Sequence, residues 1–300
     1  MKQIAIIAPT ASGKTALSIK LAHKTNSIIL SLDSLAIYKQ IDIASAKPTL
    51  KERDGIVHFG IDEIYPDEKF DVMKFIEIYN KAKDYAKVNN KNLIIVGGTG
   101  FYLKAMIDGI SYIPAPSIGI ANIIKEKLQN FTPQELYEYM SRIDEEYIQN
   151  IKSNDIYRIE KALSVYLITK QKPSEYFKNN PPKPIIKDIQ LFEITWDREL
   201  LRKRIEQRTN IMFESGLLNE VCFLINNYTR EHTSMKSIGI KEALDYFDGK
   251  ITKQEAINKV AIATAQLAKR QRTFNNSQFK DVIKLPLDKM ENDILKYFNF

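Results

Sequence analysis

Short apolar runs rich in β-branched residues recur along the chain, separated by segments of helical length. Three of them, residues 3–8, 27–32 and 92–96, lie in the first third of the sequence, and two more, 189–196 and 281–285, lie in its last part. Strands buried on both faces of a parallel sheet have this nearly continuous apolar composition. The pattern therefore predicts an α/β fold with a parallel sheet of at least five strands, flanked by helices.

The character of the chain changes over residues 114–185, which are highly charged and helical in composition. Thr132-Pro133-Gln134-Glu135 is typical of a helix start with proline at the first position. The prolines within residues 179–184 exclude a continued helix and indicate a return to the sheet. We therefore expect an inserted helical lobe over residues 114–185, and a core formed by residues 1–113 and 186–300.

Two further helices are predicted in the last third of the chain. Asp197 is a suitable N-cap for the first of them, and Gly216 is a suitable stop. The second covers residues 255–274, where apolar side chains recur at helical spacing and Lys269 and Arg270 lie off the apolar face. We expect this second helix to present a basic edge.

The first apolar run leads directly into a sequence typical of a phosphate-binding loop, a P-loop. Ala8-Pro9-Thr10-Ala11-Ser12-Gly13-Lys14-Thr15 follows a predicted strand and opens a predicted helix, which is the context that such a loop requires. Backbone N–H groups and the helix N-terminus attract an anion, Lys14 adds a full positive charge, and the Thr15 hydroxyl can hold Mg²⁺. Ala8 replaces the usual glycine, yet the run as a whole predicts a phosphate site.

A phosphate loop indicates that the ligand carries phosphate, but it does not indicate which reaction takes place. The residues at the ends of the predicted strands exclude some of the possible reactions. Enzymes that hydrolyse nucleoside triphosphates usually hold their metal with an Asp after an apolar strand, whereas the third run ends in Gly97-Gly98-Thr99-Gly100. Asp33 follows the second run. Because the carboxyl ends of parallel strands form the ligand crevice, we expect Asp33, Thr99 and the phosphate loop to converge there. Taken alone, Asp33 is better explained as an N-cap, and the glycine run as a tight turn.

Composition restricts the partners and the compartment. The 44 Lys and Arg residues exceed the 37 Asp and Glu residues, giving a formal charge of +7 that suits a polyanion without requiring one. Cys222 has no partner for a disulfide and the three histidines lack ligand spacing, so we expect no structural metal. No apolar stretch approaches the roughly 18–20 residues that span a bilayer, and the first run is too short for a signal peptide. We therefore expect a cytoplasmic monomer with no membrane partner.

Taken together, these motifs resemble the tRNA dimethylallyltransferases of bacterial type. The resemblance runs in family order over residues 4–276 and so covers nearly the whole chain. Its stretches are residues 8–15, 33–38, 46–48, 97–102, 154–163, 198–208, 238–242 and 268–271.

The resemblance implies a reaction and a site. Members of this family transfer a dimethylallyl group from dimethylallyl diphosphate to the exocyclic amine of the adenosine 3′ of the anticodon, with Mg²⁺ and release of diphosphate. Asp33 would accept the proton of the amine, and Thr99 would hydrogen-bond near the reacting groups. The loop residues 8–15 would bind the diphosphate together with Arg198 and Arg204, and Thr15 would hold the metal.

The resemblance also implies contacts to the anticodon arm of tRNA. These residues are basic, polar or placed at the mouth of the crevice: Asp33, Ser34, Leu35, Ala36, Tyr157, Arg158, Lys161, Lys236, Lys241, Lys269, Arg270, Gln271 and Arg272. The chain departs from the family pattern at Ile240, Ala265 and Phe274, where tyrosine, arginine and tryptophan are common. These departures affect individual tRNA contacts and not the diphosphate site.

Two other functions are compatible with parts of the sequence. A nucleotide or small-molecule kinase would use the same phosphate loop, helical insert and arginine-bearing helix, with Asp33 activating a hydroxyl. A non-catalytic nucleic-acid-binding protein would not need Asp33. The glycine turn, Asp33-Ser34 and the basic last helix favour the transferase, and whether ATP also occupies the loop stays open.

Overall fold

The computed structural model describes residues 1–299, and the chain divides into two compact units. One unit consists of Met1–Ala105 together with the chain from Ile186 onward, and the other is Met106–Ile185. The second unit thus begins at Met106, ahead of the boundary at residue 114 that the sequence suggested. We describe each unit by itself.

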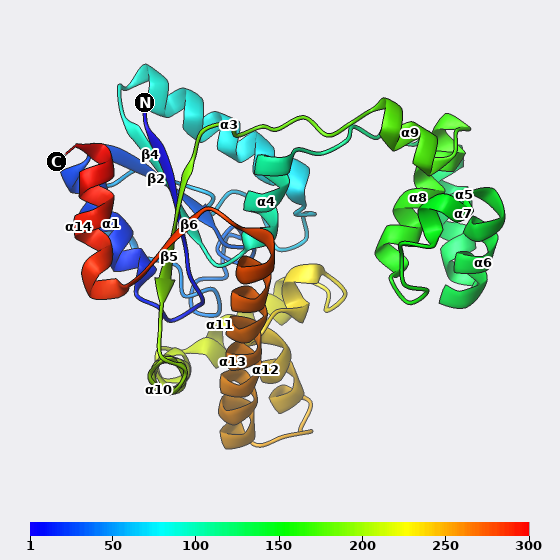
Figure 1. The fold of residues 1–300 in the computed structure, drawn as a ribbon. Coiled ribbons are helices and arrows are strands. Elements are labelled where there is room, and N and C mark those ends of the chain that lie inside the picture. The colour runs from blue at the N-terminus through cyan, green and yellow to red at the C-terminus, as the bar shows by residue number, and fades with distance from the viewer. Residues whose placement is uncertain (300) are drawn as a thin grey trace. The chain divides into compact units, whose positions relative to one another are not determined.

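The first unit is built on a parallel sheet of six strands in the order β3-β2-β4-β1-β5-β6 (Figure 1). Five strands fall on the predicted apolar runs: β1 (Gln3–Ile7), β2 (Ser27–Leu32), β4 (Asn92–Gly97), β5 (Gln190–Thr195) and β6 (Val282–Pro286). The sixth, β3 (His58–Phe59), has only two residues, too few to form an apolar run. The predicted parallel α/β fold is therefore confirmed, with one edge strand missed.

Helices cover both faces of this sheet, which explains why its strands are apolar throughout. On one face, α1 (Lys14–Lys24) and α14 (Leu287–Phe298) pack on a core that includes Ile4, Ile6 and Phe192. On the other face, α3 (Val72–Val88) buries Phe75, Ile78 and Tyr79. The short helix α2 (Leu50–Arg53) precedes β3, and α4 (Gly100–Asp108) follows β4.

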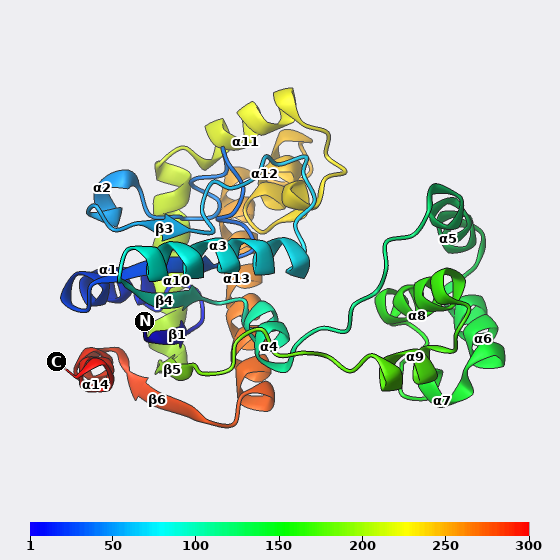
Figure 2. The ribbon, with the colours of Figure 1, turned by 90° about the horizontal axis from the view of Figure 1, so that it is seen from above.

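A group of helices lies beyond the carboxyl ends of the strands (Figure 1). It comprises α10 (Arg198–Glu214), α11 (Leu217–Asn227), the 3-10 turn η1 (Thr233–Lys236), α12 (Ile240–Phe247) and α13 (Lys253–Gln278). Asp197 caps α10 by accepting from the backbone N–H groups of Glu199 and Leu200, as predicted. α10 follows the carboxyl end of β5, and α13 leads into the amino end of the parallel neighbour β6, so both helices connect to the β5–β6 side of the sheet (Figure 2).

The second unit is helical. It contains α5 (Ile118–Asn130), α6 (Pro133–Ile143), α7 (Glu145–Ile148), α8 (Ile156–Thr169) and α9 (Pro173–Asn179). Thr132 and Glu135 form the capping box that starts α6. The unit has its own core, centred on Leu136, Met140 and Ile159. Within residues 1–299, no helix combines the length and the apolar character needed to cross a bilayer.

Candidate active site

The loop between β1 and α1 has a backbone shaped to expose its amides. Ala11 and Gly13 both have positive φ, 62° and 84°, and Gly13 is the N-cap of α1 without a side chain that could cap the first turn. The loop is tied to the neighbouring strand end, because Ala8 N–H donates to Gly97 O at 3.2 Å. The hydroxyl of Ser12 is buried and has no hydrogen-bond partner within residues 1–299. The loop therefore offers several unsatisfied donors to a ligand.

Helix α10 closes one side of this loop with two arginines. Arg204 Nε donates to Ala11 O at 2.8 Å, and Arg208 Nη1 donates to Thr10 Oγ1 at 2.9 Å. The two residues are four apart and so lie on the same face of the helix. Arg204 also stacks 4.8 Å from the ring centre of Trp196, whose Nε1 donates to Ser12 O at 3.0 Å. These contacts fix the two guanidinium groups at the loop.

Helix α13 reaches the loop from another direction through Gln271. Its side-chain oxygen accepts from Thr10 N–H at 3.2 Å, so Thr10 is held by both helices. A Cβ atom on Gly98 would lie 2.3 Å from Nε2 of Gln271, and one on Gly97 would lie 2.1 Å from Leu32 O. Only glycine fits at position 97, where the clash is with backbone, whereas a side chain at position 98 would displace the Gln271 amide from the loop. The predicted tight turn is therefore also a packing requirement, since β2 and α13 approach the backbone here.

Asp33 and Thr99 lie at adjacent strand ends, β2 and β4. Leu32 pairs with Gly97 in the sheet, and Thr99 N–H donates to Leu32 O at 3.3 Å. Asp33 Oδ1 accepts from the backbone N–H groups of Leu35 at 2.8 Å and Ala36 at 3.2 Å. The other carboxylate oxygen makes no hydrogen bond within residues 1–299. Asp33 thus holds a turn and caps no helix, and it still presents one oxygen that can accept a proton.

The charges at this site are concentrated and partly buried. The pKa of Lys14 is lowered to about 8, first by burial of the ammonium group and then by repulsion from Arg208, while attraction to Asp33 opposes the change. Burial also lowers the pKa of Arg208, again with Asp33 as the opposing charge. Placing like charges together in a poorly solvated space costs free energy unless an anion is bound.

These groups surround a cavity of about 1030 Å³ that is strongly basic. Its walls include residues 11–16 of the loop and the side chains of Lys20, Lys24, Lys47, Lys51, Arg204 and Arg208. Three of these lysines already have acidic partners. Lys47 pairs with Asp42 at 2.7 Å and with Asp62, and Lys20 and Lys24 share Glu291 at 2.6 and 2.8 Å. The remaining cations suit a ligand with several negative charges, such as a diphosphate.

Known proteins with a similar sequence or structure identify the family. The family described as IPP transferase matches residues 36–278, well over half of the chain. A tRNA dimethylallyltransferase from Aliarcobacter butzleri is 53% identical over 299 residues and covers 100% of both chains. The chain belongs to the IPP transferase family. The family that the sequence motifs predicted is thereby confirmed.

Solved structures of relatives agree with this assignment. The tRNA delta(2)-isopentenylpyrophosphate transferase of Staphylococcus epidermidis is 33% identical, with a TM-score of 0.70 over 99% of this chain and 98% of that chain. A eukaryotic dimethylallyltransferase acting on tRNA shares the fold, with a TM-score of 0.84 and 24% identity over 100% of this chain and 79% of that chain. The fold of this IPP transferase is therefore that of its relatives over its whole length.

The structure separates two arginines of this IPP transferase that the sequence analysis grouped. Arg204 faces the loop, whereas Arg198 lines a different cavity together with Lys269 and Arg272. The second arginine at the loop is Arg208, which was not among the residues predicted to bind the diphosphate. Helical spacing could have predicted this position, because Arg208 follows Arg204 by about one turn and therefore lies on the same face of α10.

The four consecutive residues 269–272 point in different directions around α13. Gln271 contacts the phosphate loop, Lys269 and Arg272 face α10, and Arg270 lies on a further face beside Phe274. Lys269 also lines the hollow beside Arg270 and Phe274, so it lies between Arg270 and Arg272. A basic edge of Lys269, Arg270 and Arg272 stays a prediction, whereas Gln271 faces the loop.

The other residues expected to bind tRNA are spread over both units. Ser34 is exposed, Leu35 is half-buried and Ala36 is buried, so Ala36 contributes to the fold of the crevice. Tyr157, Arg158 and Lys161 share α8 in the second unit, where Tyr157 is exposed and Lys161 lies 5.5 Å from its ring centre. Lys236 ends η1, and Lys241 lies in the first turn of α12.

The electrostatics of the loop can be tested through Lys14. We expect a lysine pKa of about 8 that rises in Arg208→Gln, because the repulsion between the two cations is removed. A side-chain NMR titration measures this pKa, and the Lys14 resonance is assigned by its absence in Lys14→Arg. Since the ammonium form is lost as the pH rises through this pKa, affinity for inorganic pyrophosphate should also fall above pH 8 in the wild type.

Arg198→Gln is the matched control for this titration, because it removes an arginine of the same helix that faces the other cavity. It should leave the Lys14 titration unchanged. A Lys14 pKa that stays constant or falls in Arg208→Gln would contradict the proposed geometry.

Proposed function

We propose that this protein transfers a dimethylallyl group from dimethylallyl diphosphate to the exocyclic N6 amine of the adenosine 3′-adjacent to the anticodon in tRNA, releasing diphosphate. The observation that carries the proposal is a basic loop cavity in a chain of the IPP transferase family, with the Asp33 carboxylate close enough to Lys14 and Arg208 to affect the pKa of both. A tRNA substrate makes the cytoplasm the compartment of the reaction.

The phosphate loop provides the site for the diphosphate. Residues Ala8, Pro9, Thr10, Ala11, Ser12, Gly13, Lys14 and Thr15 would surround it, with the amides of the loop and of the first turn of α1 as donors. Arg204 and Arg208 approach from α10 and supply charge that matters most as the carbon–oxygen bond breaks, when negative charge collects on the leaving diphosphate. This arrangement stabilises the transition state more than the ground state.

Asp33 is the general base. The adenine amine is a weak nucleophile because its lone pair is delocalised into the ring, and it must lose a proton as the new carbon–nitrogen bond forms. The carboxylate is held by two backbone N–H groups through Oδ1, which leaves Oδ2 to accept that proton. Thr99 at the neighbouring strand end can hydrogen-bond the amine or the diphosphate. The adenosine reaches Asp33 by leaving its stack in the anticodon loop.

Mg²⁺ fits the oxygen groups that the loop presents. Within residues 1–299, no three His, Cys, Asp or Glu side chains come together as a metal cage, and Mg²⁺ bound to a phosphorylated substrate does not need one, because it keeps several waters. The Thr15 hydroxyl at the start of α1 would hold it beside the diphosphate. When bound, the metal would neutralise part of the charge of the diphosphate.

The tRNA would be held by cations outside the loop cavity. Arg270 is exposed on a face of α13 that carries Phe274 and Thr273, and Lys236 and Lys241 lie on η1 and α12. In the second unit, Tyr157, Arg158 and Lys161 offer an aromatic ring and two cations on one helix, a combination suited to unstacked RNA. The family match favours this use of the basic residues over the kinase alternative.

Asp33→Asn tests the base assignment. Asparagine keeps an oxygen that can accept from Leu35 and Ala36, so the turn is preserved while the proton acceptor is lost. We expect kcat for tRNA prenylation to fall about 10²–10⁴-fold with tRNA affinity unchanged. Asp84→Asn, the same change at an exposed carboxylate of α3, is the control and should retain the wild-type kcat. An Asp33→Asn enzyme within a few-fold of wild type would refute the base assignment.

Arg270→Ala tests the tRNA surface separately from the diphosphate site. If Arg270 contacts one backbone phosphate, the dependence of log affinity on log salt should become shallower by roughly 0.7–0.9. Binding of dimethylallyl diphosphate should stay the same. Lys289→Ala on α14, an exposed lysine on a helix that covers the sheet, is the matched control. Equal salt slopes for Arg270→Ala and Lys289→Ala would exclude Arg270 from the tRNA interface.

A further inference from the structure

A second cavity, of about 740 Å³, lies between α10 and α13 and is distinct from the loop cavity. The two cavities use different faces of α10: Arg198, Arg202 and Ile205 line this one, while Arg204 and Arg208 line the other. Residues of α13 form the wall of the cavity opposite α10. None of the chemistry proposed above takes place in this cavity.

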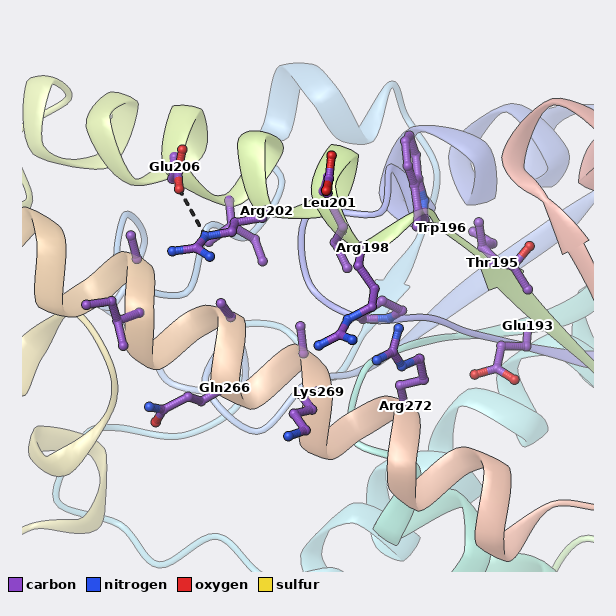
Figure 3. A pocket seen from close by; sticks show the side chains of 18 of the residues that line it. Glu193, Thr195, Trp196, Arg198, Leu201, Arg202, Glu206, Gln266, Lys269 and Arg272 are labelled. Carbon is purple, nitrogen blue, oxygen red and sulfur yellow. Dashed lines mark ion pairs between the residues drawn. The ribbon is translucent and has the colours of Figure 1, made fainter.

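Three cations in this cavity lack a counter-charge. Figure 3 shows Arg198 and Arg272 pointing toward one another from α10 and α13. Lys269 lines the same cavity from α13, with its tip turned away from the two guanidinium groups. Among residues 1–299, none of the three forms an ion pair with a carboxylate.

The carboxylates that line the cavity do not neutralise these cations. Glu193 pairs with Lys284 at 3.3 Å and accepts from Asn275, and Glu206 pairs with Arg202 at 3.4 Å. Glu199, the third acidic residue of the wall, makes no ion pair within the described chain. Overall, five cationic side chains line the cavity against three carboxylates.

The remaining wall is apolar and made of small side chains. Ala261, Ala265 and Ala268 recur at helical spacing on α13 and leave room opposite Leu201 and Ile205 of α10. A concave space with cations at one side and an apolar wall at the other suits a compact, phosphorylated molecule or a phosphate group on a larger one.

We propose that this cavity is a second anion site, in which Arg198, Lys269 and Arg272 bind the phosphate oxygens of a ligand distinct from the diphosphate held by the loop. Two guanidinium groups and one ammonium group in a shared space favour phosphate, because guanidinium donors match its oxygens in pairs. The ligand is either a free phosphorylated molecule or a backbone phosphate of bound RNA, which present the same chemistry.

The two anion sites share a wall. Trp196 lines the second cavity, its Nε1 donates to Ser12 O of the loop, and the Arg204 guanidinium stacks on its ring at 4.8 Å. It is the single tryptophan of the chain. Its fluorescence should therefore respond to filling of either cavity.

Equilibrium dialysis with radiolabelled inorganic pyrophosphate tests the proposal by stoichiometry. The wild type should bind two pyrophosphates per chain. Arg198→Gln/Arg272→Gln should retain one at wild-type affinity and bind the other about tenfold or more weakly, the loss expected when charged hydrogen bonds are removed. Arg208→Gln should weaken the other site instead. Trp196 fluorescence should change in two phases in the wild type and in one phase in each of these two variants.

Arg270→Gln is the matched control, since it removes an arginine from another face of α13 and should keep two sites. A wild type that binds a single pyrophosphate, or a double variant with two unchanged sites, would overturn the proposal. Adding an anticodon stem-loop RNA identifies the source: displacement of the second pyrophosphate assigns this site to an RNA phosphate, and retention assigns it to a free molecule. Both results are consistent with a second anion site, and they differ only in the source of the phosphate.

Discussion

The structure depends on holding positive charge in a partly buried loop. Arg208 lies close enough to Lys14 to lower its pKa, and Asp33 is the charge that opposes the lowered pKa of both groups. Such an arrangement is unfavourable without an anion, so the surrounding fold must provide the free energy that keeps it in place. A sheet whose central strands are fully buried on both faces supplies that rigid support.

Two helices distant in sequence from the loop complete it. Thr10 is held by Arg208 from α10 and by Gln271 from α13, and Ala11 and Ser12 accept from Arg204 and Trp196. The loop conformation is thus coupled to the position of both helices. Since α13 also carries Arg270, one rigid element joins the proposed tRNA surface to the diphosphate site, which fits a reaction that needs both substrates in place.

Much of the fold could be predicted from sequence, because helices, strands and caps depend on residues that are close together along the chain. The long apolar strands, the loop before α1 and the cap at Asp197 follow from pattern and position alone. The strand β3 could not be predicted, because its two residues are too few to show a periodic pattern of apolar side chains. The roles of Arg198 and Gln271 were assigned from family order, and Arg208 was not selected, because the packing of α10 against α13 decides which cavity each side chain faces. The division of residues 269–272 among different faces follows from helical geometry once the helix is recognised.

The central claim is that this loop binds a prenyl diphosphate whose carbon chain is transferred, and not a nucleotide whose phosphate is transferred. Incubating the protein with unmodified tRNA and dimethylallyl diphosphate, followed by mass spectrometry of the nucleosides, tests it most directly. We predict one adenosine per tRNA bearing a dimethylallyl group, with no labelled product when γ-labelled ATP and nucleosides replace the diphosphate. Unmodified adenosine together with transfer of the labelled phosphate would contradict the account.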